Sequence, residues 1–298
     1  MMRDGVSPSQ LYLPKSAAQP ATIFEYVYSK FPHVGLAVWQ ARFEDGLVTD
    51  SQGIALRIDS PYRHGETISY YRHLPDETVV PFEHHIIYEN QDLMVVDKPH
   101  FLTVAPAGRY VQQTLLTRLK RITANGDLSP VHRLDRETAG LILFTKTSGA
   151  RRLYQSLFAT QQITKVYHAI APMTQAHRFP LAIELHLERG EPFYTMAVGK
   201  GAPNTHTDMD VLAVSDDGKW AKYELRPTTG KLHQLRVHLN HLGIPIAHDS
   251  YYPCVVHRAE DDFDHPLQLL AKRLSFTDPI THEPMSFESS FELDFSKV

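Results

Sequence analysis

The order of apolar and polar positions predicts a small separate unit at the start of the chain. The first twenty residues are rich in Pro, Ser and Gln and show no period, which predicts an extended arm. Residues 22–45 have helical spacing interrupted at Pro32, which predicts two helices joined by a turn. Residues 46–72 contain short apolar runs separated by Gly and Pro, a pattern typical of short strands.

The rest of the chain, after a predicted linker at 73–85, alternates between strand and helix patterns. Apolar runs predict strands at 86–88, 93–96, 139–144 and 165–171, and several more within 181–225. Apolar residues at helical spacing predict a helix over 113–122 and a second helix that begins after Ser148, its expected N-cap. A third helix is predicted across Leu235, Leu239 and Leu242, and it ends at Gly243. Strands in hairpins with a few helices predict an α+β fold around a mixed, mainly antiparallel sheet, plus the small N-terminal α/β appendage.

Length and composition limit the class of protein. The chain has 298 residues, of which 42% are hydrophobic and 21% charged, as in a folded globular protein rather than a disordered one. No apolar run approaches the roughly 18 residues of a membrane span, and the first ten residues lack the apolar segment of a signal peptide. We therefore expect a cytoplasmic protein without a membrane partner, divided into an appendage at 1–80 and a larger domain at 81–298.

Positive charge is concentrated in one part of the sequence. The net charge of −4 argues mildly against a nucleic-acid partner. Residues 98–168, however, carry 11 basic and 3 acidic groups, whereas the segments on both sides are acidic. Gathered in one cleft, these cations would attract a phosphate backbone; paired with the acidic flanks, they would be solvated helix faces. Charge by itself leaves both possibilities open.

The most informative stretch is residues 131–146, which read VHRLDRETAGLILFTK. Asp135 lies between Arg133 and Arg136, shortly before the apolar run at 139–144, which is typical of a strand buried on both faces. A carboxylate beside cations stays ionised, so it can act as a nucleophile or a base at neutral pH. A structural arginine–aspartate pair would give the same pattern.

Three other segments accompany this one: VVDKP around Lys98, KVYHA at 165–169 and TTGKLHQLRVH at 228–238. The four segments together resemble the motifs of RluA-type RNA pseudouridine synthases. The central motif of that family is His-Arg-Leu-Asp, two variable residues, Thr-Ser/Ala-Gly-Leu and an apolar run, which residues 132–144 match. Its other two motifs are Lys-x-Tyr-x-Ala and Gly-Arg/Lys-x-His-Gln-Ile/Leu-Arg-x-His, which the last two segments match.

The resemblance covers roughly residues 84–290 and implies the pseudouridine synthase fold, RNA as the partner and no cofactor. It implies isomerisation of specific uridines in ribosomal or transfer RNA, with Asp135 as the catalytic aspartate. Arg236 would pair with that aspartate, and Tyr167 would stack on the uracil and help to remove its C5 proton. Arg133 would fill the gap left by a flipped-out base or clamp a phosphate. The other substrate-binding residues that it implies are Leu235, His132, Thr138 and Lys98.

The sequence departs from the family pattern in places that border the expected site. The usual Lys-Pro-x-Gly has Phe101 at its last position, the usual Thr of the third motif is Leu232, and residues 248–252 read HDSYY where Gly-Asp-x-x-Tyr-Gly is common. These departures are expected to change the rim of the site. Residues 22–72 faintly resemble a small RNA-binding domain of ribosomal proteins, but their 5 basic and 6 acidic groups do not make a basic face.

Two other functions fit parts of the pattern. One is an RNA-binding or RNA-folding protein on the same scaffold, in which catalysis is dispensable; the intact Asp135, Tyr167 and Arg236 argue against it. The other is a hydrolase that uses Asp135 on a glycosidic or ester bond of a small molecule; the basic segment 98–168 argues against it.

Eighteen histidines and one cysteine, Cys254, raise the question of a metal site or a disulfide. The pairs His84/His85 and His238/His241 have no Cys or Glu at the spacing of a zinc site, and one cysteine cannot form an internal disulfide. No metal and no cofactor are therefore expected, and nothing indicates an obligate protein partner.

Overall fold

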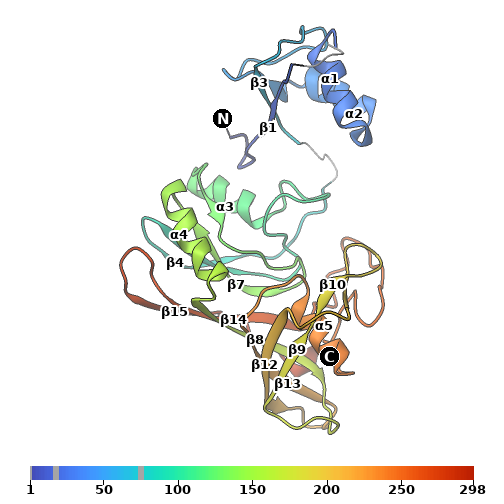
Figure 1. Ribbon diagram of the computed structural model, residues 1–298, viewed down its shortest axis with the longest axis vertical. Coiled ribbons are helices and arrows are strands. Elements are labelled where there is room, and N and C mark those ends of the chain that lie inside the picture. The colour runs from blue at the N-terminus through green and yellow to red at the C-terminus, as the bar shows by residue number, and fades with distance from the viewer. Residues whose placement is uncertain (1, 16–19, 73–76) are drawn as a thin grey trace. The chain divides into compact units, whose positions relative to one another are not determined.

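The computed structural model describes residues 2–15, 20–72 and 77–298, so part of the predicted linker lies outside the described residues (Figure 1). The chain forms two compact units. The smaller unit contains the residues up to Glu77 together with 106–112 and 117–126. The larger unit contains 78–105, 113–116 and 127–298. Two segments from beyond the predicted boundary at residue 80 thus belong to the smaller unit.

The smaller unit has its own core. Helices α1 (Ile23–Lys30) and α2 (Leu36–Glu44), joined by a 3-10 turn at Pro32–Val34, confirm the predicted turn at Pro32. The accompanying antiparallel sheet has the order β1 (Ser9–Tyr12), β3 (Thr67–Tyr70), β2 (Val48–Thr49). Ile23, Trp39 and Ile68 are buried between the helices and this sheet. The N-terminal segment is therefore not only an extended arm, because part of it pairs as β1.

Lys120 illustrates how the later segments join the smaller unit. It lies in helix α3 (Leu115–Thr123), and its side chain is 6% exposed. Its ammonium donates hydrogen bonds to the Ser7 hydroxyl at 2.8 Å and to the Gly126 carbonyl at 2.7 Å. This cation of the basic segment therefore supports the fold and is not presented to solvent.

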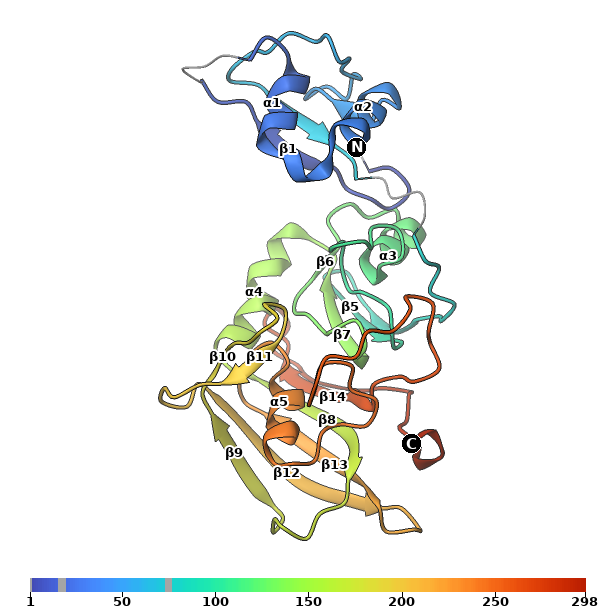
Figure 2. The same cartoon turned by 90° about the vertical axis from the view of Figure 1, so that its right-hand side faces the viewer.

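The larger unit is built on one ten-stranded sheet (Figures 1 and 2). Its main path runs β4 (His85–Glu89), β5 (Leu93–Lys98), β7 (Ala139–Thr145), β14 (Leu269–Thr277), β8 (Ile163–Pro172), β13 (Trp220–Pro227), β12 (Thr205–Val214), β9 (Leu181–Leu185). Two shorter strands extend it, β6 (Ser129–Pro130) beside β7 and β15 (Pro284–Glu288) beside β14. A separate hairpin is formed by β10 (Leu187–Arg189) and β11 (Met196–Val198). Among the strands of the described residues, only β7 and β14 pair in parallel, which confirms the mainly antiparallel α+β prediction.

Helices cover two parts of this sheet. Helix α4 (Ser148–Ala159) buries Tyr154 and Leu157 against residues of β5 and β7. Its N-cap is Thr147, whose hydroxyl accepts from the amide of Ala150 at 3.3 Å, so the prediction of Ser148 as N-cap was wrong by one residue. A 3-10 turn at Phe295–Lys297 lies near the C-terminus. Among the described residues, no helix has the length and apolar composition needed to cross a bilayer.

Helix α5 (Gln234–His241) covers the other part of the sheet (Figure 2). Leu235 and Leu239 are buried against residues of β8 and β13. Gly243, with φ of +77°, follows the helix as the leucine pattern predicts. The apolar stripe therefore fixes which face of α5 turns toward the sheet.

The start of β7 requires a glycine. Gly140 has φ of +108°, and it pairs with Ala271 of β14. A Cβ atom at this position would overlap the backbone of Ala271. Since only glycine allows both this conformation and this approach, the segment that leads into β7 is held close to β14.

Candidate active site

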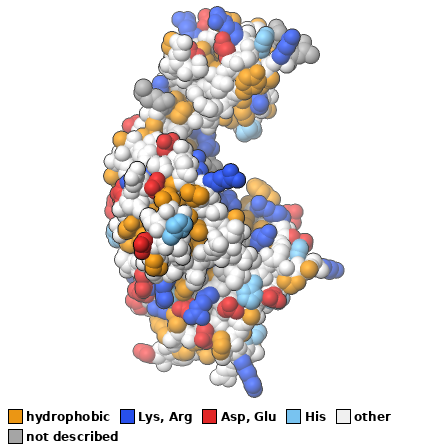
Figure 3. Space-filling model, turned by 60° about the vertical axis from the view of Figure 1, so that its left-hand side comes forward, with side chains coloured by type: hydrophobic (Ala, Val, Ile, Leu, Met, Phe, Trp, Pro, Cys, Tyr) orange, Lys and Arg blue, Asp and Glu red, His pale blue; other side chains and the backbone are white. Residues whose placement is uncertain are grey.

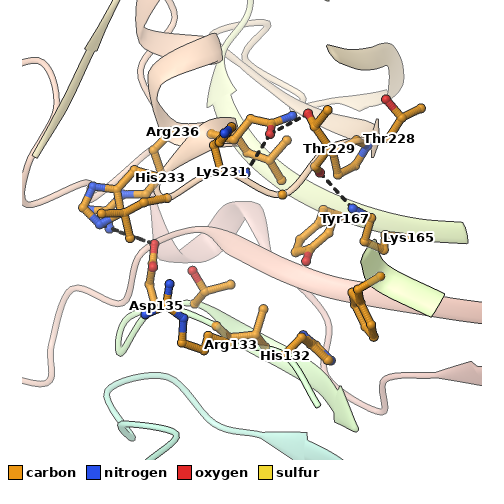
Figure 4. A pocket seen from close by; sticks show the side chains of 18 of the residues that line it. His132, Arg133, Asp135, Lys165, Tyr167, Thr228, Thr229, Lys231, His233 and Arg236 are labelled. Atoms are coloured by element: carbon orange, nitrogen blue, oxygen red, sulfur yellow. Dashed lines mark hydrogen bonds and ion pairs between the residues drawn. The ribbon is translucent and has the colours of Figure 1, made fainter. Parts of the chain in front are cut away.

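A cavity of about 680 Å³ opens in the larger unit (Figure 4). One wall is the segment from Val131 to Thr138 that precedes β7, and the opposite wall is residues 227–236. Lys165 and Tyr167 of β8 lie between the two walls. The lining includes seven of the eight predicted site residues: Asp135, Tyr167, Arg236, Arg133, Leu235, His132 and Thr138.

The guanidinium of Arg236 is the centre of a buried charge cluster. Its side chain is 1% exposed, and it forms a two-pronged pair with Asp249, Nε to Oδ2 at 2.9 Å and Nη2 to Oδ1 at 2.6 Å. It also contacts Asp135 and Glu137, each at 3.3 Å. The rings of Tyr251 and Tyr252 pack over it at 4.7 and 5.6 Å. The pairing of Arg236 with Asp135 that the resemblance implied is present in the structure.

These carboxylates keep Arg236 charged in spite of its burial. Burial alone would lower the pKa of Arg236, but the hydrogen bonds to Asp249 and the charges of Asp135 and Glu137 raise it above its usual value. Glu137 is held in turn by the Ser250 hydroxyl, which donates to it at 2.8 Å. The cluster therefore supplies a fixed positive charge beside Asp135.

His233 is a site residue for which the sequence indicated only a motif position. It takes the left-handed conformation, with φ of +53°, directly before α5. Its Nδ1 atom pairs with the hydroxyl of Tyr252 at 3.0 Å, and its Nε2 atom lies 3.8 Å from Oδ2 of Asp135. Burial lowers the pKa of His233, against the opposing effect of Asp135, so the ring is uncharged near neutral pH. It therefore borders the carboxylate of Asp135 without forming a strong ion pair with it.

Two side chains of β8 bring opposite chemical properties to the cavity. Burial and, to a smaller extent, the charge of Asp135 raise the pKa of Tyr167 above its usual value, so the phenol stays protonated near neutral pH. Burial lowers the pKa of Lys165 to about 8. The Lys165 ammonium donates to the carbonyl of Thr229 at 2.8 Å and so ties β8 to the opposite wall.

His132 anchors the wall that carries Asp135. Its Nε2 atom accepts a hydrogen bond from the amide of Leu143 at 3.2 Å, and its ring stacks on Phe158 of α4 at 4.4 Å. Burial lowers the pKa of His132 to about 3, so the ring is neutral. Thr138 closes the same segment, because its amide donates to the carbonyl of Asp135 at 3.2 Å. Both residues line the cavity, and both also fix the backbone around Asp135.

Lys98 does not line the cavity. Its side chain is fully buried, and its ammonium donates to the carbonyls of Pro99, Leu102 and Arg136 at 2.9, 2.9 and 3.1 Å. Burial lowers the pKa of Lys98 to about 7. The structure therefore gives this predicted substrate-binding residue a supporting place behind the segment that contains Asp135.

The basic segment contributes to the site through few of its members. Arg133 and Lys165 line the cavity, and Lys231 joins them from the opposite wall. Elsewhere, basic and acidic side chains are interspersed on the face shown in Figure 3. Within the described ranges, no group of three His, Cys, Asp or Glu side chains is placed to hold a metal ion.

Comparisons with known proteins identify the class. Residues 92–241 match the family model described as RNA pseudouridylate synthase. A protein of Synechocystis named an uncharacterized RNA pseudouridine synthase is 30% identical over 77% of this chain and 79% of its own length. Ribosomal large subunit pseudouridine synthase D of Haemophilus influenzae is 29% identical over 78% of this chain and 76% of its own length. The mitochondrial tRNA pseudouridine(32) synthase of Saccharomyces cerevisiae is 35% identical over 64% of this chain but only 41% of its own length.

Solved structures agree on the fold. Human RNA pseudouridylate synthase domain containing 1 superposes with a TM-score of 0.59 at 23% identity, over 72% of this chain and 86% of that one. Human RNA pseudouridylate synthase domain containing 4 superposes with a TM-score of 0.53 at 24% identity, over 71% of this chain and 89% of that one. The fold is thus that of a pseudouridine synthase. This chain belongs to the RluA-type family of RNA pseudouridylate synthases, which confirms the prediction from the motifs.

Proposed function

We propose that Asp135 is the group with which this RNA pseudouridine synthase converts uridine to pseudouridine. The observation that carries the proposal is a difference among the three carboxylates around Arg236. The side chains of Asp249 and Glu137 are 0% and 15% exposed, whereas that of Asp135 is 25% exposed. Asp135 is also the one of the three that lines the cavity.

The isomerisation explains why such a carboxylate is needed. The bond from C1′ of the ribose to N1 of uracil breaks, the base turns, and a bond from C1′ to C5 forms. A proton leaves C5 and one is taken up at N1, so atoms and electrons balance without an external donor or acceptor. A carboxylate stabilises or traps the cationic sugar, or removes the neighbouring sugar proton, as glycosidase carboxylates manage similar charge. The reaction therefore needs no cofactor.

The other cavity residues follow from their chemistry. Arg236 positions Asp135, because its buried guanidinium forms an ion pair with that carboxylate at 3.3 Å. The Tyr167 ring packs against the uracil; its hydroxyl is protonated near neutral pH, so it takes part in C5 proton removal only by passing a proton on. Leu235 completes the apolar side of the uracil pocket.

Arg133 has an exposed side chain at the edge of the cavity. A uridine within a stacked strand cannot place its sugar bond against Asp135, so it must be turned out of the stack. We assign Arg133 to the space that the base leaves; a phosphate clamp is the other use of the same group.

The proposed substrates are specific uridines in structured ribosomal or transfer RNA. The relatives support this range, since the Haemophilus protein is named for the large ribosomal subunit and the yeast protein for tRNA. Pseudouridine mapping in total RNA from cells with and without this gene identifies the target. Release of tritium from RNA that contains 5-tritiated uridine then measures turnover by the purified protein.

The same assay separates the alternatives. RNA binding without tritium release would favour a binding or folding protein, and release of free uracil or sugar would favour a hydrolase. Loss of a mapped pseudouridine in the deletion strain, with tritium release from an RNA containing that site, is the result expected here.

A further inference from the structure

A row of four aromatic rings leads from the catalytic carboxylate to the protein surface. It begins at His233, 3.8 Å from Asp135, and continues to Tyr251 with ring centroids 5.3 Å apart. Tyr194 follows Tyr251 at 5.5 Å, and Phe193 follows Tyr194 at 5.5 Å. The row therefore joins the wall of the cavity to the loop of the β10–β11 hairpin.

Exposure increases along this row. His233 is 8% exposed, Tyr251 and Tyr194 are half-buried, and Phe193 is 78% exposed. Phe193 has the highest exposure among the large hydrophobic side chains of the described residues. An aromatic ring left in water at the end of a row of packed rings has an open face for a further planar group.

Backbone and side-chain hydrogen bonds fix the hairpin that carries the outer rings. The amide of Thr195 donates to the carbonyl of Pro192 at 2.8 Å, and Arg189 donates to the carbonyl of Phe193 at 3.3 Å. The amide of Met196 donates to the hydroxyl of Tyr252 at 2.8 Å, which links the hairpin to the segment beside Arg236. These hydrogen bonds therefore fix the position of Phe193 and Tyr194 relative to the cavity.

We propose that this aromatic row is a stacking platform for an unpaired nucleotide next to the target uridine. The proposal rests on the proposed function, because a strand whose ribose reaches Asp135 must continue past His233 or along the opposite side. Every base offers a planar face, so a row of rings binds flanking nucleotides with little sequence preference. The continuity of the row with the cavity favours the same RNA strand over a separate partner protein.

The test combines removal of a ring with removal of a base. The probe is an RNA fragment of about twenty nucleotides around the mapped uridine, alone and with one abasic residue at each of the two positions on either side. The protein variants are Phe193→Ala and Phe193→Leu, with Leu212→Ala as the control for loss of an exposed apolar side chain, since Leu212 is 47% exposed on β12. Dissociation constants and single-turnover rates are measured for every pair.

We expect Phe193→Ala to weaken binding of the intact fragment at least about fivefold, the lower end of what base–aromatic stacking contributes. Phe193→Leu should lose nearly as much, because it keeps apolar area but has no aromatic face. Removal of the base at one of the tested positions should weaken RNA binding by the wild-type protein by a similar factor. The same abasic RNA should bind Phe193→Ala no more weakly than the intact RNA does. Such non-additivity identifies a direct contact.

Additive losses, or unchanged binding by Phe193→Ala, would overturn the platform; the exposed ring would then fit a protein partner. These results are distinct from failure of the proposed function, in which the wild-type protein does not isomerise the intact fragment. A variant that removes a more buried ring, Tyr194→Ala, should weaken binding, and Tyr194→Phe should restore it. Failure of Tyr194→Phe to restore binding would also count against stacking.

Discussion

Arg236 makes its closest contacts with Asp249 rather than with Asp135. Two nitrogen–oxygen distances of 2.6 and 2.9 Å join Arg236 to Asp249, whereas one of 3.3 Å joins it to Asp135. Asp249 also accepts from the backbone amides of Tyr251 and Tyr252, so it is itself fixed. The arginine is thus anchored by a residue outside the cavity, and Asp135 keeps a charged neighbour while its side chain stays exposed to the cavity.

Asp135→Asn should lower the single-turnover rate of isomerisation at least about 10³-fold, equivalent to about 4 kcal/mol of transition-state stabilisation. The amide keeps the shape of the side chain but has neither the charge nor the nucleophilic oxygen. Tritium release measures the rate, and circular dichroism with urea unfolding checks the fold. Asp216→Asn, an exposed change in the loop between β12 and β13, is the matched control. Turnover by a folded Asp135→Asn protein near the wild-type rate would contradict the assignment.

Asp249→Asn should damage both stability and catalysis. Breaking a buried ion pair leaves Arg236 less well compensated, so the free energy of unfolding should fall by about 3 kcal/mol. We expect kcat to fall on the order of 100-fold with KM changed by less than about threefold, because Arg236 positions Asp135 rather than binding RNA. Ser250→Ala, which removes a hydrogen bond to Glu137 but none to Arg236, is the control. A kcat within twofold of wild type in Asp249→Asn would show that Asp249 does not position the arginine.

Gly140→Ala should be much more destabilising than Gly218→Ala. Both glycines have positive φ, +108° and +71°, but a Cβ at Gly218 meets nothing within 4 Å, whereas one at Gly140 overlaps Ala271. We expect a loss of about 1 kcal/mol for Gly218→Ala and at least about 3 kcal/mol for Gly140→Ala, measured by urea unfolding. Equal losses would mean that β7 and β14 separate easily at this point.

The unfolding free energy should fall as the pH drops below about 6.5. Burial lowers the pKa of His132 to about 3 and those of His100 and His238 to about 4. Below the pKa of an unfolded histidine, the unfolded chain binds protons that these folded rings refuse, so acid favours unfolding. The contribution of these three histidines to the free energy of unfolding is fully present above about pH 6.5 and is lost progressively as the pH falls toward 4.

His238→Gln provides the check on this pH dependence. Urea unfolding measures the free energy of unfolding at each pH between 6 and 4.5. The slope of this free energy against pH should be smaller in His238→Gln than in the wild type by up to one proton, about 1.4 kcal/mol per pH unit. An unchanged slope would show that His238 is protonated in the folded protein.

The sequence predicted the parts of the site that depend on local pattern. The leucine spacing of α5, the apolar run of β7 and the motif residues around Asp135 all follow from short-range regularities, and the structure shows each of them. Residues 132–138 and 228–238 contribute to opposite walls of one cavity. From the sequence, this meeting could be expected only through the family resemblance, because no short-range pattern links the two segments. Tertiary contacts that no short pattern encodes were missed.

Asp249 and Lys98 are the clearest examples of such contacts. Asp249 keeps the aspartate of a segment whose first glycine is replaced by His248, but nothing local shows that it forms the main pair with Arg236, 13 residues earlier. Lys98 was expected to bind substrate, but three backbone carbonyls converge on its ammonium from two separate segments. Burial of a charge depends on what packs around it, and that is decided by the whole fold.

The position of β14 has a consequence for how the enzyme is made. This strand, residues 269–277, lies in the sheet between β7, which follows Asp135 in the sequence, and β8, which carries Tyr167. A growing chain emerges from the ribosome in order, so β7 and β8 wait for more than a hundred further residues before the strand that joins them exists. The sheet that holds the two walls of the cavity can therefore be completed only after residue 277 has been made, so no shorter nascent chain contains the finished cavity.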